Sequence, residues 1–144
     1  MGDSAIRGQK KRILFLCTGN SSRSQMAEGF MRKYFGDIFK VFSAGINPSE
    51  VNPNTIKVMK EIGIDISKHT SKSVELFRKK KFDYLITVCD NAKEACPFFT
   101  NEVKNRLHWS LEDPAETIGA QEEIIKIFRE IRDLIKNEIL KYFN

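Results

Sequence analysis

The chain of 144 residues lacks the signals of membrane insertion and of secretion. No apolar run approaches the roughly 20 residues that span a bilayer, and residues 1–11 contain no apolar stretch of the kind found in secretory signals. The chain also lacks an even number of cysteines: the total of three, Cys17, Cys89 and Cys96, excludes a fully paired disulfide framework. We therefore expect a cytoplasmic protein without a membrane partner, whose cysteines are thiols.

A nucleic-acid-binding pattern is missing as well. The net charge is +5, and the excess lies largely in residues 7–12 and 78–81. Neither run is interleaved with aromatic residues, and the second is typical of the solvated end of a short helix. We expect no nucleic-acid partner, and a small anionic substrate fits the positive charge at least as well.

Metal-ligand pairs, internal repeats and low-complexity segments are absent too. A zinc site would need the three cysteines and one of only two histidines, with none of the close ligand pairs usual for zinc, so no metal is predicted. No second-domain boundary is visible, and a chain of this length buries a sizeable core by itself. We predict a flexible tail over residues 1–10 and a single domain over residues 11–144, with nothing that demands more than a monomer.

The sequence does contain an alternation of short apolar runs and amphipathic stretches. Strands are predicted at residues 12–16, 40–43, 83–88 and 106–109, and helices at residues 26–36, 53–63 and from about 120 onward. The inner faces of the last two helices are expected at Ile56, Met59 and Ile62, and at Ile124, Phe128, Ile131 and Ile135. This order predicts an α/β fold with a single open four-stranded parallel sheet flanked by helices.

Four side chains that can carry chemistry stand at or just after the ends of predicted strands. They are Cys17, Ser43, Cys89 and Asp113. In open parallel sheets, ligands bind beyond the carboxyl ends of the strands. We therefore expect the four side chains at one edge of the sheet.

The loop after the first strand has the composition of an oxyanion site. Cys17 and Arg23 are six positions apart between a buried strand and a helix, where backbone N–H groups and the helix N-terminus can surround a tetrahedral oxyanion. The Arg23 guanidinium can bind two of its oxygens, and the positive field favours a nucleophilic Cys17 thiolate. The candidate oxyanion-binding residues are Thr18, Gly19, Asn20, Ser21, Ser22, Arg23 and Ser24. The alternative is a buried structural cysteine beside a surface arginine.

Asp113, followed by Pro114, offers a carboxyl group on a different loop of the same edge. Cleavage or exchange at an oxyanion needs a proton donor at the departing oxygen, and Asp113 is the candidate. By itself Asp-Pro is only a turn signal. Together with the Cys17 loop it favours a catalytic role.

Cys89 and Cys96 form the third feature. Seven residues apart on a helix, they would be separated by about 10 Å, whereas a disulfide needs Cα atoms within about 7 Å. Linking them requires the segment to unwind, which is the behaviour of a redox switch. The alternative is two small buried side chains, since cysteine is often buried.

Four motifs together give the chain a family resemblance. They are residues 17–29 (CTGNSSRSQMAEG), residues 42–45 (FSAG), Cys89 with Cys96-Pro97, and His108-Trp109 with Asp113-Pro114-Ala115. From about residue 12 to the C-terminus, the sequence resembles the thioredoxin-coupled arsenate reductases of the low-molecular-weight protein tyrosine phosphatase superfamily. The resemblance implies a low-molecular-weight phosphatase-like fold.

The resemblance also implies a three-cysteine relay. Cys17 would attack arsenate, with Asp113 protonating the leaving hydroxide. Cys89 would then release arsenite as a Cys17–Cys89 disulfide forms, and Cys96 would resolve it to a Cys89–Cys96 disulfide that thioredoxin reduces. Arg23 would hold the oxyanion, no cofactor is required, and the role would be arsenic resistance with weak phosphatase side activity.

Two positions depart from the family pattern. Many members carry a second cysteine in the loop where this chain has Ser22, but the relay does not need it. Members that bind potassium use residues matching Asn20, Glu28 and Ser43 with an acidic residue, and Lys72 stands in the place of that acid. An ammonium there would repel potassium and could replace it, so no metal is predicted.

Three other functions remain open on the sequence. A phosphotyrosine phosphatase shares the loop and Asp113-Pro114, but such phosphatases usually follow them with aromatic residues, and here Ala115 and Glu116 follow. A cysteine phospho-carrier of sugar transport also has a reactive cysteine after its first strand, but has no need of Arg23. A sensor that only binds oxyanions would need no catalytic set.

Overall fold

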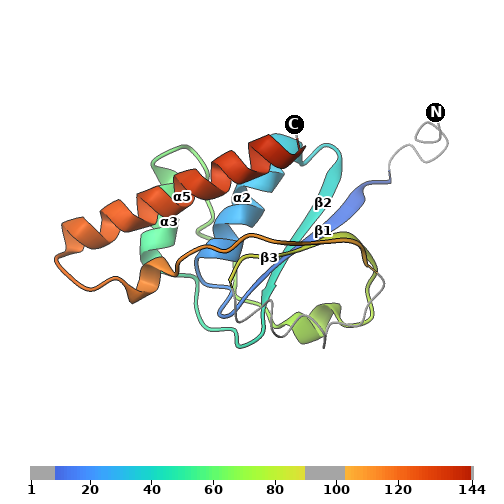
Figure 1. Cartoon of the computed structure of the whole chain (residues 1–144), viewed down its shortest axis with the longest axis horizontal. Coiled ribbons are helices and arrows are strands. Elements are labelled where there is room, and N and C mark those ends of the chain that lie inside the picture. The colour runs from blue at the N-terminus through green and yellow to red at the C-terminus, as the bar shows by residue number, and fades with distance from the viewer. Residues whose placement is uncertain (1–8, 90–102, 144) are drawn as a thin grey trace.

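A computed structural model describes residues 9–89 and 103–143, and its centre is one parallel sheet (Figure 1). The strands are β1 (Lys11–Cys17), β2 (Phe39–Gly45), β3 (Phe82–Thr87) and β4 (Val103–His108). Their order across the sheet is β2-β1-β3-β4, and every pair of neighbours is parallel. The predicted open four-stranded parallel sheet is confirmed.

The helices of the described residues follow the predicted alternation. They are α2 (Arg23–Phe35), α3 (Pro53–Lys60) and α5 (Gln121–Phe143), with short 3-10 helices at Val74–Phe77 and Pro114–Glu116. In Figure 1, α2, α3 and α5 lie together on one side of the strands, and the 3-10 helix Val74–Phe77 lies on the other. None of the helices in the described part of the chain is long and apolar enough to cross a membrane.

The first strand is buried on both faces, as its apolar run predicts. Ile13, Leu14 and Phe15 are fully buried, and Leu16 is nearly so. Burial of four consecutive large side chains stabilises the fold by about 1.5–3 kcal/mol each. It fixes the end of β1, and with it the position of Cys17.

Helix α3 begins at the residue where the sequence predicts it to begin. The Asn52 side chain accepts a hydrogen bond from the backbone N–H of Asn54, and Pro53 occupies the first turn. An asparagine cap of this kind contributes about 1 kcal/mol. The exposed basic run at 78–81 likewise begins where the 3-10 helix Val74–Phe77 ends.

The inner faces of α3 and α5 differ from the prediction. In α3 the buried residues are Thr55, Val58 and Met59, while Ile56 is only half-buried. Ile62, also half-buried, lies beyond the end of α3 at Lys60. The reason is a polar contact: the Thr55 hydroxyl donates to Ser22 Oγ at 2.9 Å and turns this face toward the Cys17 loop.

In α5 the predicted Phe128, Ile131 and Ile135 are buried, but Ile124 is only half-buried. Ile125, Ile139 and Arg132 share the buried face instead. The Arg132 guanidinium donates to the backbone oxygen of Val58 and to Glu61, so contact with α3 sets the rotation of α5.

The tail predicted over residues 1–10 lies outside the described residues except for Gln9 and Lys10, which are exposed. That part of the domain assignment therefore stays a prediction, as does the division at residue 11.

Candidate active site

The loop from Cys17 to Arg23 connects the last residue of β1 with the first residue of α2. Cys17 is 2% exposed, so the protein surrounds its sulfur almost completely. Cys17 Sγ lies 2.8 Å from Ser24 Oγ, and the Asn20 N–H donates to the same sulfur at 3.1 Å. These two contacts fix the position of the Cys17 sulfur at the end of β1.

The loop backbone is turned so that its carbonyl groups face outward. Backbone N–H groups of the segment 46–52 donate at 2.8–3.1 Å to the carbonyl oxygens of Cys17, Thr18, Gly19 and Ser21. In a planar trans peptide the C=O and the following N–H point in opposite directions. The N–H groups of residues 18–20 and 22 are therefore turned away from that segment, and the one at position 20 reaches the Cys17 sulfur. Such a set of convergent donors can hold a tetrahedral oxyanion.

Asn20 is the centre of this loop. It is fully buried, and its φ of 49° lies in the left-handed region, which Asn tolerates better than most residues. Its side-chain amide donates to Ser24 Oγ at 2.8 Å and to Ser43 Oγ at 2.9 Å, while its Oδ1 accepts from the Lys72 backbone N–H at 2.8 Å. These contacts hold the loop against β2 and the 70–73 segment.

Gln25 supports Asn20 from the first turn of α2. Its Nε2 donates to the backbone oxygen and to Oδ1 of Asn20, and to the backbone oxygen of Thr70. Its Oε1 lies 2.9 Å from Nδ1 of His69, which therefore donates to it. Ser71 Oγ donates to the Asn20 backbone oxygen at 2.7 Å, so this carbonyl too faces away from the Cys17 sulfur.

Arg23 and Asp113 come together at the mouth of the loop. Arg23 donates to the backbone oxygen of Leu111 at 2.9 Å, and its Nη2 lies 3.5 Å from Asp113 Oδ2. Asp113 Oδ1 accepts from the Ala115 N–H at 3.0 Å, which fixes the carboxyl group at the start of the 3-10 helix. The Asp113 side chain remains 32% exposed, so a proton can pass between it and solvent.

Cys89 lies next to the loop through Thr18. Cys89 Sγ is 3.1 Å from Thr18 Oγ1, and Cys89 is 4% exposed. Cys17 and Cys89 are both thiols in this structure. Cys96 lies outside the described residues, so its predicted role stays a prediction.

A charged cluster lies behind the loop around Glu28, which is 3% exposed. Glu28 accepts from the hydroxyl of Ser43 and pairs with Arg32 at 2.7 Å. Burial lowers the pKa of His69 below its usual range, against the attraction of Glu28. Burial also lowers the pKa of Lys72, with Glu28 opposing the shift and Arg32 adding to it.

Lys72 stands at the position where the family resemblance places an acidic residue of the potassium site. Its Nζ is 3.9 Å from Glu28 Oε1 and donates to the Thr70 backbone oxygen at 2.7 Å. Within residues 9–89 and 103–143, no three His, Cys, Asp or Glu side chains gather in a way that could hold a metal ion. The prediction that this site takes no metal remains to be tested by experiment.

Reasoning from the sequence did not identify Gly45 or Gln25 as site residues. A Cβ on Gly45 would come within 2.6 Å of the Thr18 backbone oxygen and 2.8 Å of the Asn20 backbone nitrogen, so only glycine fits there. A glycine two residues after the predicted strand 40–43 was the available signal. Gln25 gave no signal, because a polar residue in the first turn of a helix is ordinary.

The structure thus brings the four predicted edge residues to one place. Cys89 contacts Thr18, the residue after Cys17, while Ser43 contacts Asn20 and Asp113 contacts Arg23. The roles assigned to them remain predictions.

Known proteins support the same family as the motifs. An arsenate reductase of Halalkalibacterium halodurans is 51% identical over 130 residues, which cover 90% of this chain and 93% of that protein. A solved arsenate reductase in the phosphate-binding state superposes with a TM-score of 0.78 at 34% identity, covering 91% of this chain and 95% of that one. A thioredoxin-dependent arsenate reductase of Corynebacterium glutamicum has a TM-score of 0.61 at 29% identity, covering 96% of this chain and 67% of that one.

The family model that matches this sequence describes low molecular weight phosphotyrosine protein phosphatases and spans residues 12–144. This range covers the sheet, the Cys17 loop and α5, and it agrees with the resemblance drawn from the motifs. The chain belongs to the low molecular weight phosphotyrosine protein phosphatase family.

Proposed function

We propose that this chain reduces arsenate to arsenite through Cys17, Cys89 and Cys96, with thioredoxin as the reductant, and thereby confers arsenic resistance. The observation that carries the proposal is the contact between Thr18 Oγ1 and Cys89 Sγ, which holds a second thiol beside the nucleophile's loop. Hydrolysis of a phosphate ester has no use for that thiol. The relatives named arsenate reductase support the same activity.

In the first step, Cys17 attacks arsenic. The inward N–H groups and Arg23 bind the oxyanion, and the Cys17 thiolate forms a sulfur–arsenic bond as one As–OH bond breaks. Asp113 supplies the proton with which the hydroxide leaves as water. Donors fixed before the substrate arrives stabilise the charge that develops on oxygen.

In the second step, Cys89 attacks the sulfur of Cys17. A disulfide forms, the sulfur–arsenic bond breaks, and its electron pair stays on arsenic, which leaves as arsenite. Two electrons have then passed from the two thiolates to arsenic. The hydroxyl of Thr18 lies 3.1 Å from Cys89 Sγ and holds this sulfur beside the Cys17 loop.

In the third step, Cys96 attacks Cys89 and releases the Cys17 thiolate. The resulting Cys89–Cys96 disulfide is reduced by the dithiol of thioredoxin, which regenerates all three thiols. Each exchange needs an accessible thiolate and a leaving thiolate of low basicity. Because the cycle returns to thiols, we assign the protein to the reducing cytoplasm, where it acts as a monomer without a cofactor.

The test is NADPH oxidation coupled through thioredoxin reductase and thioredoxin, with arsenate as substrate. We expect turnover by the wild type and none above background by the Cys89→Ser variant, which retains a side chain of similar size. Hydrolysis of p-nitrophenyl phosphate serves as the control, since it needs the Cys17 loop and Asp113 but not Cys89. Intact arsenate turnover in Cys89→Ser would refute the relay.

A phosphotyrosine phosphatase is the second candidate, because it uses the same loop and carboxyl group. Against it, the positions after Asp113-Pro114 are Ala115 and Glu116, both exposed and neither aromatic. We expect hydrolysis of aryl phosphates to be weak. Efficient hydrolysis of phosphotyrosine peptides together with no thioredoxin-dependent turnover would favour this candidate.

A further inference from the structure

Positive charge gathers at the edge of the sheet where the strands begin, opposite the Cys17 loop. The two basic runs of the sequence meet there, because Arg12 Nε donates to the backbone oxygen of Lys81 at 2.9 Å. Lys40, in the first half of β2, lies beside them, with its Nζ over the same Phe42 ring as Arg12. Segments far apart in the chain thus form one cationic region.

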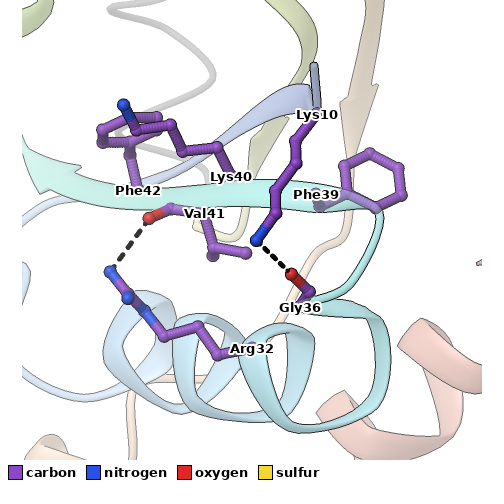
Figure 2. A pocket seen from close by; sticks show the side chains of 7 residues that line it. All are labelled: Lys10, Arg32, Gly36, Phe39, Lys40, Val41 and Phe42. Carbon is purple, nitrogen blue, oxygen red and sulfur yellow. Dashed lines mark hydrogen bonds between the residues drawn. The ribbon is translucent and has the colours of Figure 1, made fainter. Parts of the chain in front are cut away.

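Two adjoining cavities open within this region. The first has a volume of about 360 Å³ and lies between β2 and the end of α2 (Figure 2). It is lined by Lys10, Arg32, Gly36, Phe39, Lys40, Val41 and Phe42. The second, of about 660 Å³, is lined by Gln9, Lys10, Arg12 and Lys40. The two share a pair of lysines, and no Asp or Glu of the described residues lines either of them.

Neutral groups hold most of these cations in place. Figure 2 shows Lys10 donating to the Gly36 backbone oxygen, at 2.8 Å. Arg32 also reaches a backbone oxygen, that of Val41, but is the exception because it pairs with the Glu28 carboxylate. The Arg12 guanidinium lies over the Phe42 ring, 4.9 Å from its centroid. Carbonyl oxygens and ring faces orient a cation without cancelling its charge. The cavities are therefore suited to an anion.

Arg32 connects the first cavity with the catalytic loop. It pairs with Glu28, which accepts from the Ser43 hydroxyl, and Ser43 Oγ in turn accepts from the Asn20 amide. A chain of polar contacts thus runs from the first cavity to Asn20.

We propose that these two cavities form a binding site for a small polyvalent phosphate anion, distinct from the Cys17 loop. Their volumes fall within the roughly 300–1,000 Å³ that small-ligand sites occupy. Lys10, Arg12 and Lys40 supply charge-assisted hydrogen bonds to phosphate oxygens, which are about twice as strong as neutral ones. Inorganic pyrophosphate, compact and multiply charged, is the probe.

The experiment is a titration of the full chain with pyrophosphate, followed by backbone amide NMR shifts. We expect saturable shifts at Lys40 and Phe42 that fit a single dissociation constant. The double variant Lys10→Gln/Lys40→Gln should weaken this binding at least tenfold. The matched control Lys60→Gln/Lys126→Gln removes the same charge from exposed positions on α3 and α5 and should stay within twofold of wild type.

Four outcomes would overturn the assignment. Shifts confined to residues 17–24 would mean that pyrophosphate binds only the catalytic loop. Equal weakening in both double variants would mean that net charge alone attracts the anion. No saturable shift at all would mean that the cavities bind no such ligand. Binding of a single-stranded oligonucleotide at these positions without binding of pyrophosphate would make the region a nucleic-acid surface.

Discussion

Replacement of Gly45 by alanine tests whether the Cys17 loop depends on its contact with the end of β2. A Cβ at position 45 would lie 2.6 Å from the Thr18 backbone oxygen, whereas ordinary contacts begin at 3.4 Å. The nearest obstacles are backbone atoms of the loop, which cannot rotate aside as a side chain would. The loop must therefore move by about 0.8 Å to accommodate one methyl group.

A displacement of this size matters more for catalysis than for folding. Misplacing reacting groups by 1 Å costs about 100-fold in rate, so we expect kcat/KM of Gly45→Ala to fall about 30- to 100-fold, or about 2–2.7 kcal/mol. Overpacking by one methyl group costs about 1–3 kcal/mol of stability. Thioredoxin-coupled arsenate turnover measures the first effect, phosphate binding to the loop checks it without assuming the relay, and urea unfolding measures the second.

Gly63→Ala is the matched control. Gly63 has a φ of 82°, and no atom lies within 4 Å of the position that a Cβ would take, so alanine there strains the backbone without touching the loop. We expect a loss of about 1–2 kcal/mol in stability and kcat/KM within twofold of wild type. Unchanged turnover and phosphate binding in Gly45→Ala would refute the reasoning, as would an equal loss of turnover in Gly63→Ala.

Three further predictions concern the neighbours of the loop. Thr18→Val removes the hydroxyl beside Cys89 and should lower arsenate turnover about tenfold. Hydrolysis of p-nitrophenyl phosphate should stay within twofold of wild type. Equal losses in the two assays would contradict the prediction. Replacing sodium chloride by potassium chloride should leave kcat/KM of the wild type unchanged, because Lys72 supplies the cation beside Glu28. The activity of Lys72→Ala should become potassium-dependent. A potassium-specific gain in kcat/KM of the wild type would contradict this prediction. Because burial lowers the pKa of His69, the unfolded chain binds more protons below its usual value of about 6.5, and the free energy of unfolding should fall as pH drops from about 7.5 to 5. Urea unfolding across that range should show a smaller fall for His69→Gln, and an identical fall would exclude His69 as the cause.

Local signals were sufficient for the architecture. The apolar run of β1 and the cap at Asn52 are both set by neighbours in sequence, and the structure has them where they are predicted. The inner faces predicted for α3 and α5 are partly wrong because distant polar contacts decide them. Thr55 turns inward to reach Ser22, and Arg132 turns inward to reach Glu61. Hydrophobic periodicity contains no information about such contacts.

In the candidate site, too, features set by neighbouring residues could be predicted and features set by distant contacts could not. The spacing of Cys17 and Arg23 after a buried strand predicts their place at the carboxyl edge, and Asp113 follows from the same rule. Local sequence patterns do not show the environment of Asn20, because its partners Ser43 and Lys72 lie 23 and 52 residues away in sequence. Only the family resemblance grouped these positions. The need for glycine at position 45 is equally hidden from local sequence, since it arises only when β2 lies beside the Cys17 loop in the folded chain.

The orientation of the loop peptides serves two purposes at once. It anchors the loop through the C=O groups and aligns the N–H groups that would bind the oxyanion. Each carbonyl held by the segment 46–52 turns the next N–H away from that segment, so a peptide that loses its outer hydrogen bond also loses the alignment of a donor. Weakening this segment therefore reduces oxyanion affinity by more than its contribution to folding would suggest. Gly45 begins the connection, because it ends β2 directly before the first of these donors, Ile46. The precision of the oxyanion site thus depends on a strand that contributes no group to the reaction itself.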